Sequence, residues 1–266
     1  MKHRVQSRQG KEDRVVWAPP FLSACLGSNT WNCTTQKYQN LELHHTEISE
    51  VSFPTSVCPN LQHLDIQYCN DLVEVGTLPK ALITLTLENC SKLRKIEGLC
   101  GLAKLQRTQF RYLVMRSLPD SFGNLTNLEY INLSNCRELE RLPNSFGSLS
   151  KLKYLNLSCC SHLTLSSGSF GNISTLEYIN IKGCDSIEVL PSQIAHQPSL
   201  EKLDLDLPNL KEWPISAIGE PSGLEKLVLK TPLLERLSSS FGRGLWNLKY
   251  LKLRGCRSLK RFPDFI

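Results

Sequence analysis

The sequence predicts an α/β solenoid, a horseshoe-shaped stack of short repeats. A parallel β-sheet is expected on its concave face and short irregular or 3₁₀ segments on its convex face. Leucines recur at a nearly constant interval along most of the 266 residues. Each unit contains an alternating Leu-x-Leu segment, the pattern of a short strand with one buried face. No unit holds enough apolar side chains to form a core alone, so neighbouring units must stack.

The repeating unit is clearest from Leu128 onward. Its pattern is L-x-x-L-x-L-x-x-C-x-x-L-x-x-L-P-x-x-F-G-x-L, and most of the same offsets recur 24 residues later from Leu152. The first leucines of successive units are Leu61, Leu82, Leu105, Leu128, Leu152, Leu176, Leu200, Leu224 and Leu248. A degenerate unit from Tyr38 precedes them. We therefore expect a repeat domain of about ten units over residues 38–266, the last one truncated. Residues 1–37 fit no unit and form a non-repeat N-terminal segment, a candidate for disorder.

Each unit is expected to contain one strand and one return segment. The Leu-x-Leu core gives the strand, and the strands of successive units pair in parallel about 4.8 Å apart. The L-x-x-L-P segment then turns inward through irregular or 3₁₀ structure, where Pro143 and Pro191 block a long helix. In the Phe-Gly pair that follows, the ring is expected to fill the interior and the glycine to let the backbone reverse.

The repeat accounts for the positions of most of the eleven cysteines. One inward offset after Leu-x-Leu, which we call the ladder, is shared by Cys69, Cys90, Cys136, Cys160, Cys184 and Cys256. A free thiol there acts as a small buried hydrophobe, and stacked thiols stay unpaired in a reducing compartment. The sequence has no C-x-x-C pair, which argues against zinc ribbons. A zinc site from Cys58, His63 and Cys69 is conceivable, but Cys69 is expected inside the ladder and His63 outside. Neither a metal nor another cofactor is predicted.

Two units depart from the pattern because proline stands at the ladder offset, as Pro208 and Pro232. The apolar residues that follow come one position early: Leu210, Trp213, Leu234 and Leu237. A bend or local twist near residues 205–235 is the resulting hypothesis. It could shape a binding surface or be neutral drift in a tolerant repeat.

Composition and charge argue against several classes of protein. The 31 basic and 25 acidic residues give a net charge of +6, of which +4 arises within residues 1–40. A nucleic-acid-binding domain usually carries a basic stripe over its folded body, so nucleic acid is not an expected partner. No apolar run approaches the ~18–20 residues that span a bilayer, so no membrane association is expected. The apolar stretch at residues 15–27 is interrupted by two prolines, which disfavours a signal peptide.

No catalytic motif is found. The sequence has no phosphate-binding loop, kinase signature, nucleophile elbow or H-E-x-x-H pair, so an enzyme is not predicted. Glycosylation sequons occur at Asn32, Asn124, Asn132, Asn156 and Asn172. Because two of them recur with the repeat itself, we interpret the sequons as incidental.

The concave face is the candidate partner-binding surface, because side chains alternate along a strand and those flanking the inward leucines face outward. The candidate residues are Tyr130, Asn132, Tyr154, Asn156, Tyr178, Asn180, Lys182, Lys202, Lys226, Lys230, Tyr250, Lys252 and Arg254. Toward the other end of the face lie Glu42, His63, Asp65, Glu88, Arg107 and Arg111. Tyrosine is favoured at interfaces. Aligned tyrosines and asparagines are equally a product of duplication that stabilises neighbouring units, and both interpretations stay open. The lysines are mixed with Asp204 and Asp206, which favours an acidic protein surface over a phosphate backbone.

The units with cysteine at the ladder and L-P-x-x-F-G-x-L, as in residues 139–149, resemble the repeats of plant intracellular nucleotide-binding leucine-rich-repeat immune receptors. The lines PNLQHLDIQYCNDLVEV and ALITLTLENCSKLRKI are especially similar to repeats of disease-resistance proteins. The resemblance covers residues 38–266. It implies a cytoplasmic or nucleocytoplasmic sensor region that binds an effector, a host protein or a neighbouring nucleotide-binding domain.

The leading hypothesis is a protein-binding module in plant immune signalling, either the recognition part of a receptor or a repeat-only paralogue. The alternative is a secreted or cell-surface inhibitor or receptor ectodomain that uses the same face. Intact thiols and unmodified sequons would favour the first, whereas secretion and glycans would favour the second.

Overall fold

The computed structural model describes residues 15–16, 38–53, 58–171, 173–195, 197–211, 223–237, 245 and 247–261. Trp213, the sequons at Asn32 and Asn172, the end of the final unit and most of the N-terminal segment lie outside the described residues. The fold is therefore reported for the remaining turns, which include every candidate partner-binding residue.

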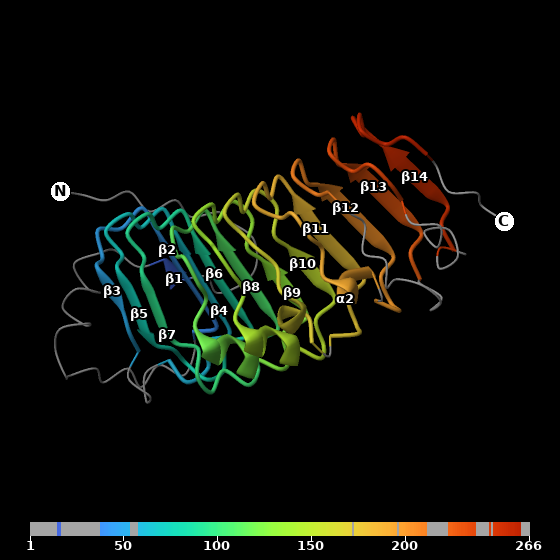
Figure 1. Ribbon diagram of the computed structural model, residues 1–266. Helices are drawn as coiled ribbons and strands as arrows, with labels where there is room; N and C mark the ends of the chain where they lie inside the picture. The colour runs from blue at the N-terminus through green and yellow to red at the C-terminus, as the bar shows by residue number, and fades with distance from the viewer. Residues whose placement is uncertain are drawn as a thin grey trace.

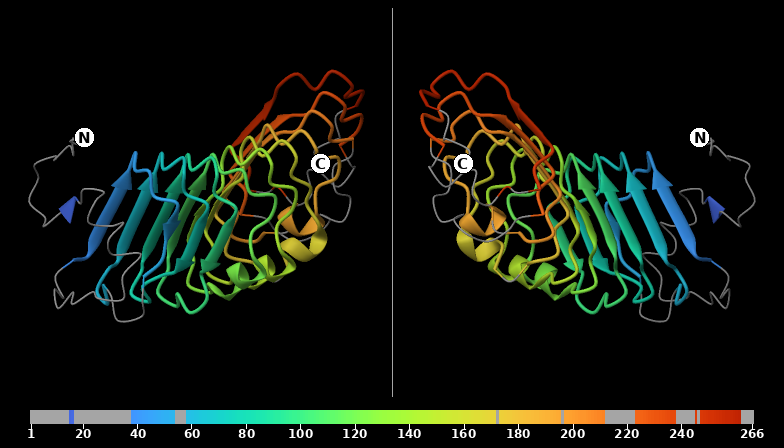
Figure 2. Two further views of the ribbon diagram at one scale, coloured as in Figure 1. Left: turned by 90° about the vertical axis from the view of Figure 1, so that its left-hand side faces the viewer. Right: turned by 90° about the vertical axis from the view of Figure 1, so that its right-hand side faces the viewer.

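Eleven parallel strands form the main sheet and follow one another in chain order. They are β1 (Val15–Val16), β2 (Asn40–His44), β4 (His63–Gln67), β6 (Thr84–Glu88), β8 (Arg107–Arg111), β9 (Tyr130–Asn132), β10 (Tyr154–Asn156), β11 (Tyr178–Lys182), β12 (Lys202–Asp206), β13 (Lys226–Lys230) and β14 (Tyr250–Leu253). From β2 onward, strands pair at matching repeat offsets, so Tyr130, Tyr154 and Tyr178 stand side by side. Figure 1 shows this order from blue to red. Figure 2 shows the orange and red turns offset from the blue and green ones, so the solenoid twists along its length. The prediction of a parallel-sheet solenoid is confirmed.

One continuous hydrophobic cluster extends through the described turns. The leucines of most Leu-x-Leu segments, such as Leu155 and Leu157, are buried on the inner side of the main sheet, whereas Leu251 and Leu253 of β14 are partly buried. Phe122 and Phe146 enter the same core from the return segments, and their stacked ring centroids lie 6.1 Å apart. A buried leucine contributes on the order of 2 kcal/mol. The fold is therefore stabilised by the core that neighbouring turns share, not by any single unit.

The N-terminal turns contain a second parallel sheet that the sequence analysis did not predict. Its strands are β3 (Glu50–Val51), β5 (Glu74–Thr77) and β7 (Lys95–Gly98), which occupy the return segments (Figure 1). In a central turn, Pro143 stands at the offset of Gly76. Proline has no N–H to donate to a sheet, so it ends strand pairing there. Among the described residues of the central turns, an isolated bridge between Ser117 and Arg141 is what remains of this second sheet.

The central turns return through short helices instead. These are the 3₁₀ helices η1 (Asp120–Asn124), η2 (Asn144–Ser148) and η3 (Ser167–Ser169) and the short helix α2 (Ser192–Ala195). Phe146 is buried as predicted. The following Gly147 was expected to let the chain reverse, but its φ is not positive. A Cβ on Gly147 would lie 3.0 Å from the Cα of Gly171, and one on Gly123 would lie 2.1 Å from the carbonyl oxygen of Ser145. Glycine is required here because successive turns pack closely.

The ladder cysteines are hydrogen-bonded to the preceding turn. The thiols of Cys136, Cys160 and Cys184 donate to backbone carbonyl oxygens one turn back, at 3.0, 3.2 and 3.1 Å. Burial raises the pKa of Cys136 and of Cys184 to about 12, so these thiols remain protonated and unreactive. Cys159, in contrast, is exposed, and Cys256 in the ladder is half-buried. The buried ladder cysteines are therefore small interior side chains, as the sequence predicted, and their thiols also donate hydrogen bonds.

The residue before the ladder position adopts a left-handed backbone conformation in many turns, a feature that the sequence analysis missed. These residues are His45, Tyr68, Asn89, Tyr112, Asn135, Cys159, Gly183 and Gly255, with φ between 54° and 69°. The backbone N–H of Asn135, for example, donates to the carbonyl oxygen of Ser158 in the next turn at 2.8 Å. The left-handed residue thus continues the pairing between turns while directing the next side chain inward.

The turns with Pro208 and Pro232 keep the main sheet but shift the ladder by one residue. Strands β12 and β13 pair in register along their full length. Leu207 and Thr231, each directly before the proline, are fully buried in place of the cysteine. The N–H of Leu210 donates to the carbonyl oxygen of Leu207, the bond that closes the cysteine turns. The sequence analysis placed the prolines at the ladder, and this is wrong. These turns omit the left-handed residue, so the residue before each proline takes the ladder position.

Candidate protein-interaction surface

The solvent-facing side of the main sheet, which we call the open face, carries the alternate side chains that do not enter the core. The structure places all the candidate partner-binding residues on the open face, with Arg254 directly after β14. They come from six neighbouring strands, β9 to β14 (Figure 1). Alternation along the strands therefore located the residues, and the structure adds how they contact one another.

Three tyrosines form a stacked column across β9, β10 and β11. The ring centroids of Tyr130 and Tyr154 lie 4.3 Å apart, and those of Tyr154 and Tyr178 lie 4.6 Å apart, with nearly parallel planes. The guanidinium of Arg107 lies 4.1 Å from the Tyr130 centroid, and Lys202 Nζ lies 4.9 Å from that of Tyr178. Both ends of the column are thus closed by cations. The ring faces are occupied, so the column presents ring edges and hydroxyl groups to a partner.

The hydroxyls of Tyr154 and Tyr178 remain protonated across the physiological range. Burial, reinforced by the neighbouring tyrosines, raises the pKa of Tyr154 to about 12. Burial also raises the pKa of Tyr178, and the carboxylate of Asp204 acts in the same direction. A protonated phenol can donate a hydrogen bond to a carboxylate or a carbonyl oxygen. The column is therefore a row of donors on a rigid apolar base.

The asparagines beside the tyrosines are tied to their own backbone. The side-chain oxygens of Asn132, Asn156 and Asn180 accept hydrogen bonds from the backbone N–H two residues later, at 3.0 to 3.1 Å. Asn132 is also buried. The bond satisfies a backbone donor where the strand ends, the local role that asparagine often takes. The side chains of Asn156 and Asn180 also hydrogen-bond to Tyr154 and Tyr178, so the asparagine row supports the tyrosine column.

The open face becomes basic over β11 to β14. The carboxylate of Asp204 is buried, with Lys182 and Lys202 ammonium groups 3.2 and 3.6 Å away. Lys230 pairs with Asp206 at 2.8 Å. Lysines 226 and 252 and Arg254 continue the row, beside the exposed ring of Tyr250. Lys226 Nζ lies 5.0 Å from the centroid of that ring.

At the opposite end of the open face, the outward residues are acidic on β2, β4 and β6 and basic on β8, and several of these charged side chains contact one another. Burial raises the pKa of Asp65, although its carboxylate accepts hydrogen bonds from Gln67 at 3.0 Å. His44 Nε2 lies 3.6 Å from the same carboxylate. Glu88 pairs with Arg111 at 3.2 Å. The sequence placed these residues at this end, but it did not reveal which carboxylates are neutralised.

Two exposed aromatic residues stand at the edge of the open face, in the left-handed row. Tyr68 and Tyr112 are each 41% exposed. Tyr68 stacks on His45 at 4.8 Å, and the guanidinium of Arg111 lies 5.4 Å from the Tyr112 centroid. The left-handed conformation of a bulky residue could not be read from the repeat pattern, so the sequence analysis did not include either tyrosine.

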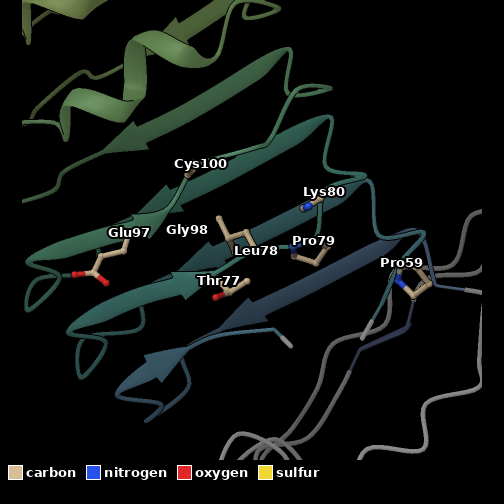
Figure 3. Close-up of a pocket in the computed structure, with 8 residues that line it drawn as sticks. All are labelled: Pro59, Thr77, Leu78, Pro79, Lys80, Glu97, Gly98 and Cys100. Atoms are coloured by element: carbon tan, nitrogen blue, oxygen red, sulfur yellow. The ribbon is translucent and has the colours of Figure 1, made fainter. Parts of the chain in front are cut away.

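An open hollow of about 260 Å³ lies over the second sheet, away from the open face. Figure 3 shows its lining, which includes Leu78, Pro79, Glu97 and Cys100. Glu97 and Cys100 are exposed. The hollow brings no pair of catalytic groups together and does not contact the tyrosine column.

The side chains considered for zinc are engaged elsewhere. Cys69 Sγ lies 3.0 Å from Thr46 Oγ1, and His63 Nδ1 lies 2.8 Å from Thr84 Oγ1. Within the described ranges, no group of three or more His, Cys, Asp or Glu side chains is arranged to hold a metal ion. Among those same residues, no helix has both the length and the apolar character needed to cross a membrane.

The repeats have a recognisable family. Residues 127–149 and 151–173 match the Leucine Rich Repeat family. The chain therefore contains leucine-rich repeats. A curated relative, disease resistance protein RPP2A of Arabidopsis thaliana, is 28% identical over a region that covers 40% of this chain and 10% of that protein. The similarity thus spans a small part of the length of that relative.

Solved structures share the architecture. The leucine-rich-repeat domain of the type III effector XopL has a TM-score of 0.57 and 26% identity, covering 85% of this chain and 71% of that chain. A leucine-rich-repeat protein of Leptospira interrogans has a TM-score of 0.50 and 21% identity, covering 90% of this chain and 70% of that chain. YopM from Yersinia enterocolitica has a TM-score of 0.50 and 24% identity, covering 83% and 48%. The fold is that of a leucine-rich-repeat solenoid, an architecture whose extended surfaces serve protein interaction.

Proposed function

We propose that the open face binds a protein partner and that the chain is the recognition region of a plant disease-resistance protein, or a repeat-only paralogue of one. The observation that carries the binding role is the tyrosine column, which offers a row of hydroxyl donors on a rigid base flanked by cations. Tyrosine combines large contact area with a polar group, a combination favoured at interfaces. The similarity to RPP2A supports the immune role.

The proposed partner is an effector, a host protein or the nucleotide-binding domain of a longer parent protein. The proposed location is the cytoplasm. It is supported by the exposed thiol of Cys159 beside the buried thiol of Cys160, which form no disulfide. Such thiols persist where the medium is reducing. The repeat domain is proposed to extend over residues 38–266.

The test is proximity labelling in plant cells with the tagged full chain. Partners are compared between the wild type, the triple variant Tyr130→Ala, Tyr154→Ala, Tyr178→Ala, and the matching triple variant to Phe. The Phe variant keeps the stack and removes the hydroxyls. A control triple variant, Lys92→Ala, Lys211→Ala, Lys260→Ala, changes exposed side chains outside the main sheet.

We expect the Ala variant to lose partners that the control retains, and the Phe variant to show an intermediate loss. Circular dichroism and thermal unfolding of each variant separate lost binding from lost folding. If the Ala variant folds and keeps every partner, the column has only a structural role. Labelling confined to the secretory route, with glycans on the sequons, would overturn the cytoplasmic proposal.

A further inference from the structure

Charge is distributed unevenly along the open face. On β2, β4 and β6, the outward residues include Glu42, Asp65 and Glu88 but no lysine or arginine, whereas on β8 Arg107 and Arg111 face outward. On β9 and β10, the outward residues are uncharged tyrosine and asparagine. From β11 to the residue after β14, six basic residues face outward against two acidic ones. The face therefore runs from an acidic end on β2, β4 and β6, past the arginines of β8 and a neutral aromatic centre on β9 and β10, to a basic end on β11 to β14.

The basic end presents more positive charge than its ion pairs suggest. Asp204 is buried, so its carboxylate lies beneath the two lysines that contact it, and the ammonium groups are what a ligand meets. On β14, Lys252 stands opposite Val228 of β13, and Tyr250 stands opposite Lys226. These positions carry no carboxylate between neighbouring strands. Lys230 pairs with Asp206, but Lys226 and Lys252 therefore remain available to an external anion.

The closed tyrosine column argues against single-stranded nucleic acid as that anion. Proteins that bind single strands stack bases on free aromatic faces. Here Tyr154 has a ring on each side, while Tyr130 and Tyr178 are each covered by one ring and one cation. A nucleic acid continuing along the sheet would also meet the carboxylates of the acidic end. A protein of mixed charge meets neither obstacle.

We propose that the basic end, from β11 to β14, binds an acidic segment of the partner protein and thereby orients the partner along the open face. This inference rests on the proposed binding role of the open face. The acidic segment lies across the strands, where its carboxylates contact the lysines of β12 to β14 and the hydroxyl of Tyr178 on β11. A basic part of the same partner then faces Glu42 and Asp65, because Glu88 is already paired with Arg111. Because the two ends differ in sign, the reverse orientation is repelled.

The size of the acidic segment follows from the sheet. Strands are about 4.8 Å apart, and an extended chain advances about 3.4 Å per residue, so roughly five residues span β11 to β14. A synthetic acidic peptide of about eight residues is therefore a sufficient probe. Its counterparts are a neutral Gly/Ser peptide, a basic peptide and a thymidine oligonucleotide of similar length.

The experiment measures fluorescence anisotropy of each labelled probe with the full chain, at low salt and at physiological salt. The key variant reverses two charges of the basic end, Lys226→Glu with Lys252→Glu. The matched control, Lys92→Glu with Lys211→Glu, makes the same change in net charge outside the main sheet. Circular dichroism and thermal unfolding establish that both variants fold.

We expect the wild type to prefer the acidic peptide over the neutral and basic ones, with weaker binding as salt rises. The key variant should bind it at least about tenfold more weakly, and the control should change the affinity less than about twofold. Equal binding of acidic and neutral peptides, an unchanged key variant, or tighter binding of the oligonucleotide would overturn the proposal. If the tyrosine triple variant still loses its partners in cells, the open face binds protein and only the inferred chemistry is wrong.

Discussion

The N-terminal turns and the central turns build the same main sheet but return by different routes. In the N-terminal turns, β5 and β7 pair in a second sheet, and in the central turns η1 and η2 follow a proline. The Leu-x-Leu segments and the ladder are alike in both regions. The difference depends on one offset, occupied by Gly76 in the first region and Pro143 in the second. A solenoid can therefore keep one binding surface while its opposite side changes.

The largest expected effect concerns the ring in the central turns. Phe146→Ala should lower the free energy of unfolding by about 4 kcal/mol, because it removes a buried ring that stacks on Phe122. Leu99→Ala, at the equivalent place in an N-terminal turn, should cost about 3 kcal/mol. Denaturant titration measures both. A smaller loss at Phe146 than at Leu99 would show that the ring does not hold the central turns together.

Glycine should be required equally in both regions despite the different routes. Gly123→Ala and Gly98→Ala each place a Cβ against a backbone carbonyl oxygen of a neighbouring turn, at 2.1 and 1.7 Å. Each should cost about 3 kcal/mol through overpacking. The control is Gly168→Ala, whose Cβ would meet Asn144 Oδ1 at 3.4 Å, an ordinary contact. In thermal unfolding, the control should be nearly as stable as the wild type. If Gly123→Ala or Gly98→Ala is equally stable, the turns are less tightly packed than this structure indicates.

Alkaline pH should destabilise the central turns through their thiols. In the folded chain, the pKa of Cys136 is raised to about 12 by burial, whereas an unfolded cysteine titrates near its usual value of about 9. Between these values the unfolded state binds fewer protons, so the contribution of this thiol is complete below pH ~9 and declines as pH rises toward ~12.

We expect a loss of about 2 kcal/mol between pH ~9 and ~11 from Cys136 alone. Urea titration across this range measures it. Cys136→Ala should be less stable at neutral pH but should lose less stability on alkalinisation. If the free energy of unfolding falls equally steeply with pH in the wild type and the variant, ionisation of the Cys136 thiol does not cause the alkaline destabilisation.

The smallest expected effect tests the left-handed row. Gly183 has φ of 69°, and a Cβ there would meet Cys159 Sγ at an ordinary 3.5 Å, so Gly183→Ala strains the backbone without a clash. The cost should be about 1 kcal/mol. Gly168→Ala again serves as the control, because its φ is not positive. If Gly183→Ala leaves the free energy of unfolding unchanged, the backbone of this turn can adjust to avoid the strain.

The sequence predicted what depends on periodicity. The main sheet, the buried Leu-x-Leu positions, the cysteine ladder and the outward tyrosines all follow from one repeated offset. The sequence also placed the basic residues at the β11 to β14 end of the open face, since Lys202 and Lys226 stand at the tyrosine offset in later units.

Contacts between turns could not be predicted in the same way. The left-handed conformation of Tyr68 and Tyr112 depends on backbone pairing with the next turn. The closure of the tyrosine column by Arg107 requires the register and the side-chain direction together. The burial of Asp204 arises from two lysines on β11 and β12. Each feature depends on how two units meet, which the pattern of one unit does not contain.

Hydroxyl-radical footprinting of the full chain, with and without a partner captured in plant cells, tests the central claim most directly. The account predicts that Tyr130, Tyr178 and Tyr250 on the open face become protected. Val189 and Leu233, which are exposed outside the main sheet, should react as before. Protection of Val189 and Leu233 with unchanged tyrosines would show that the partner binds elsewhere, and it would contradict the assignment of the open face as the binding surface.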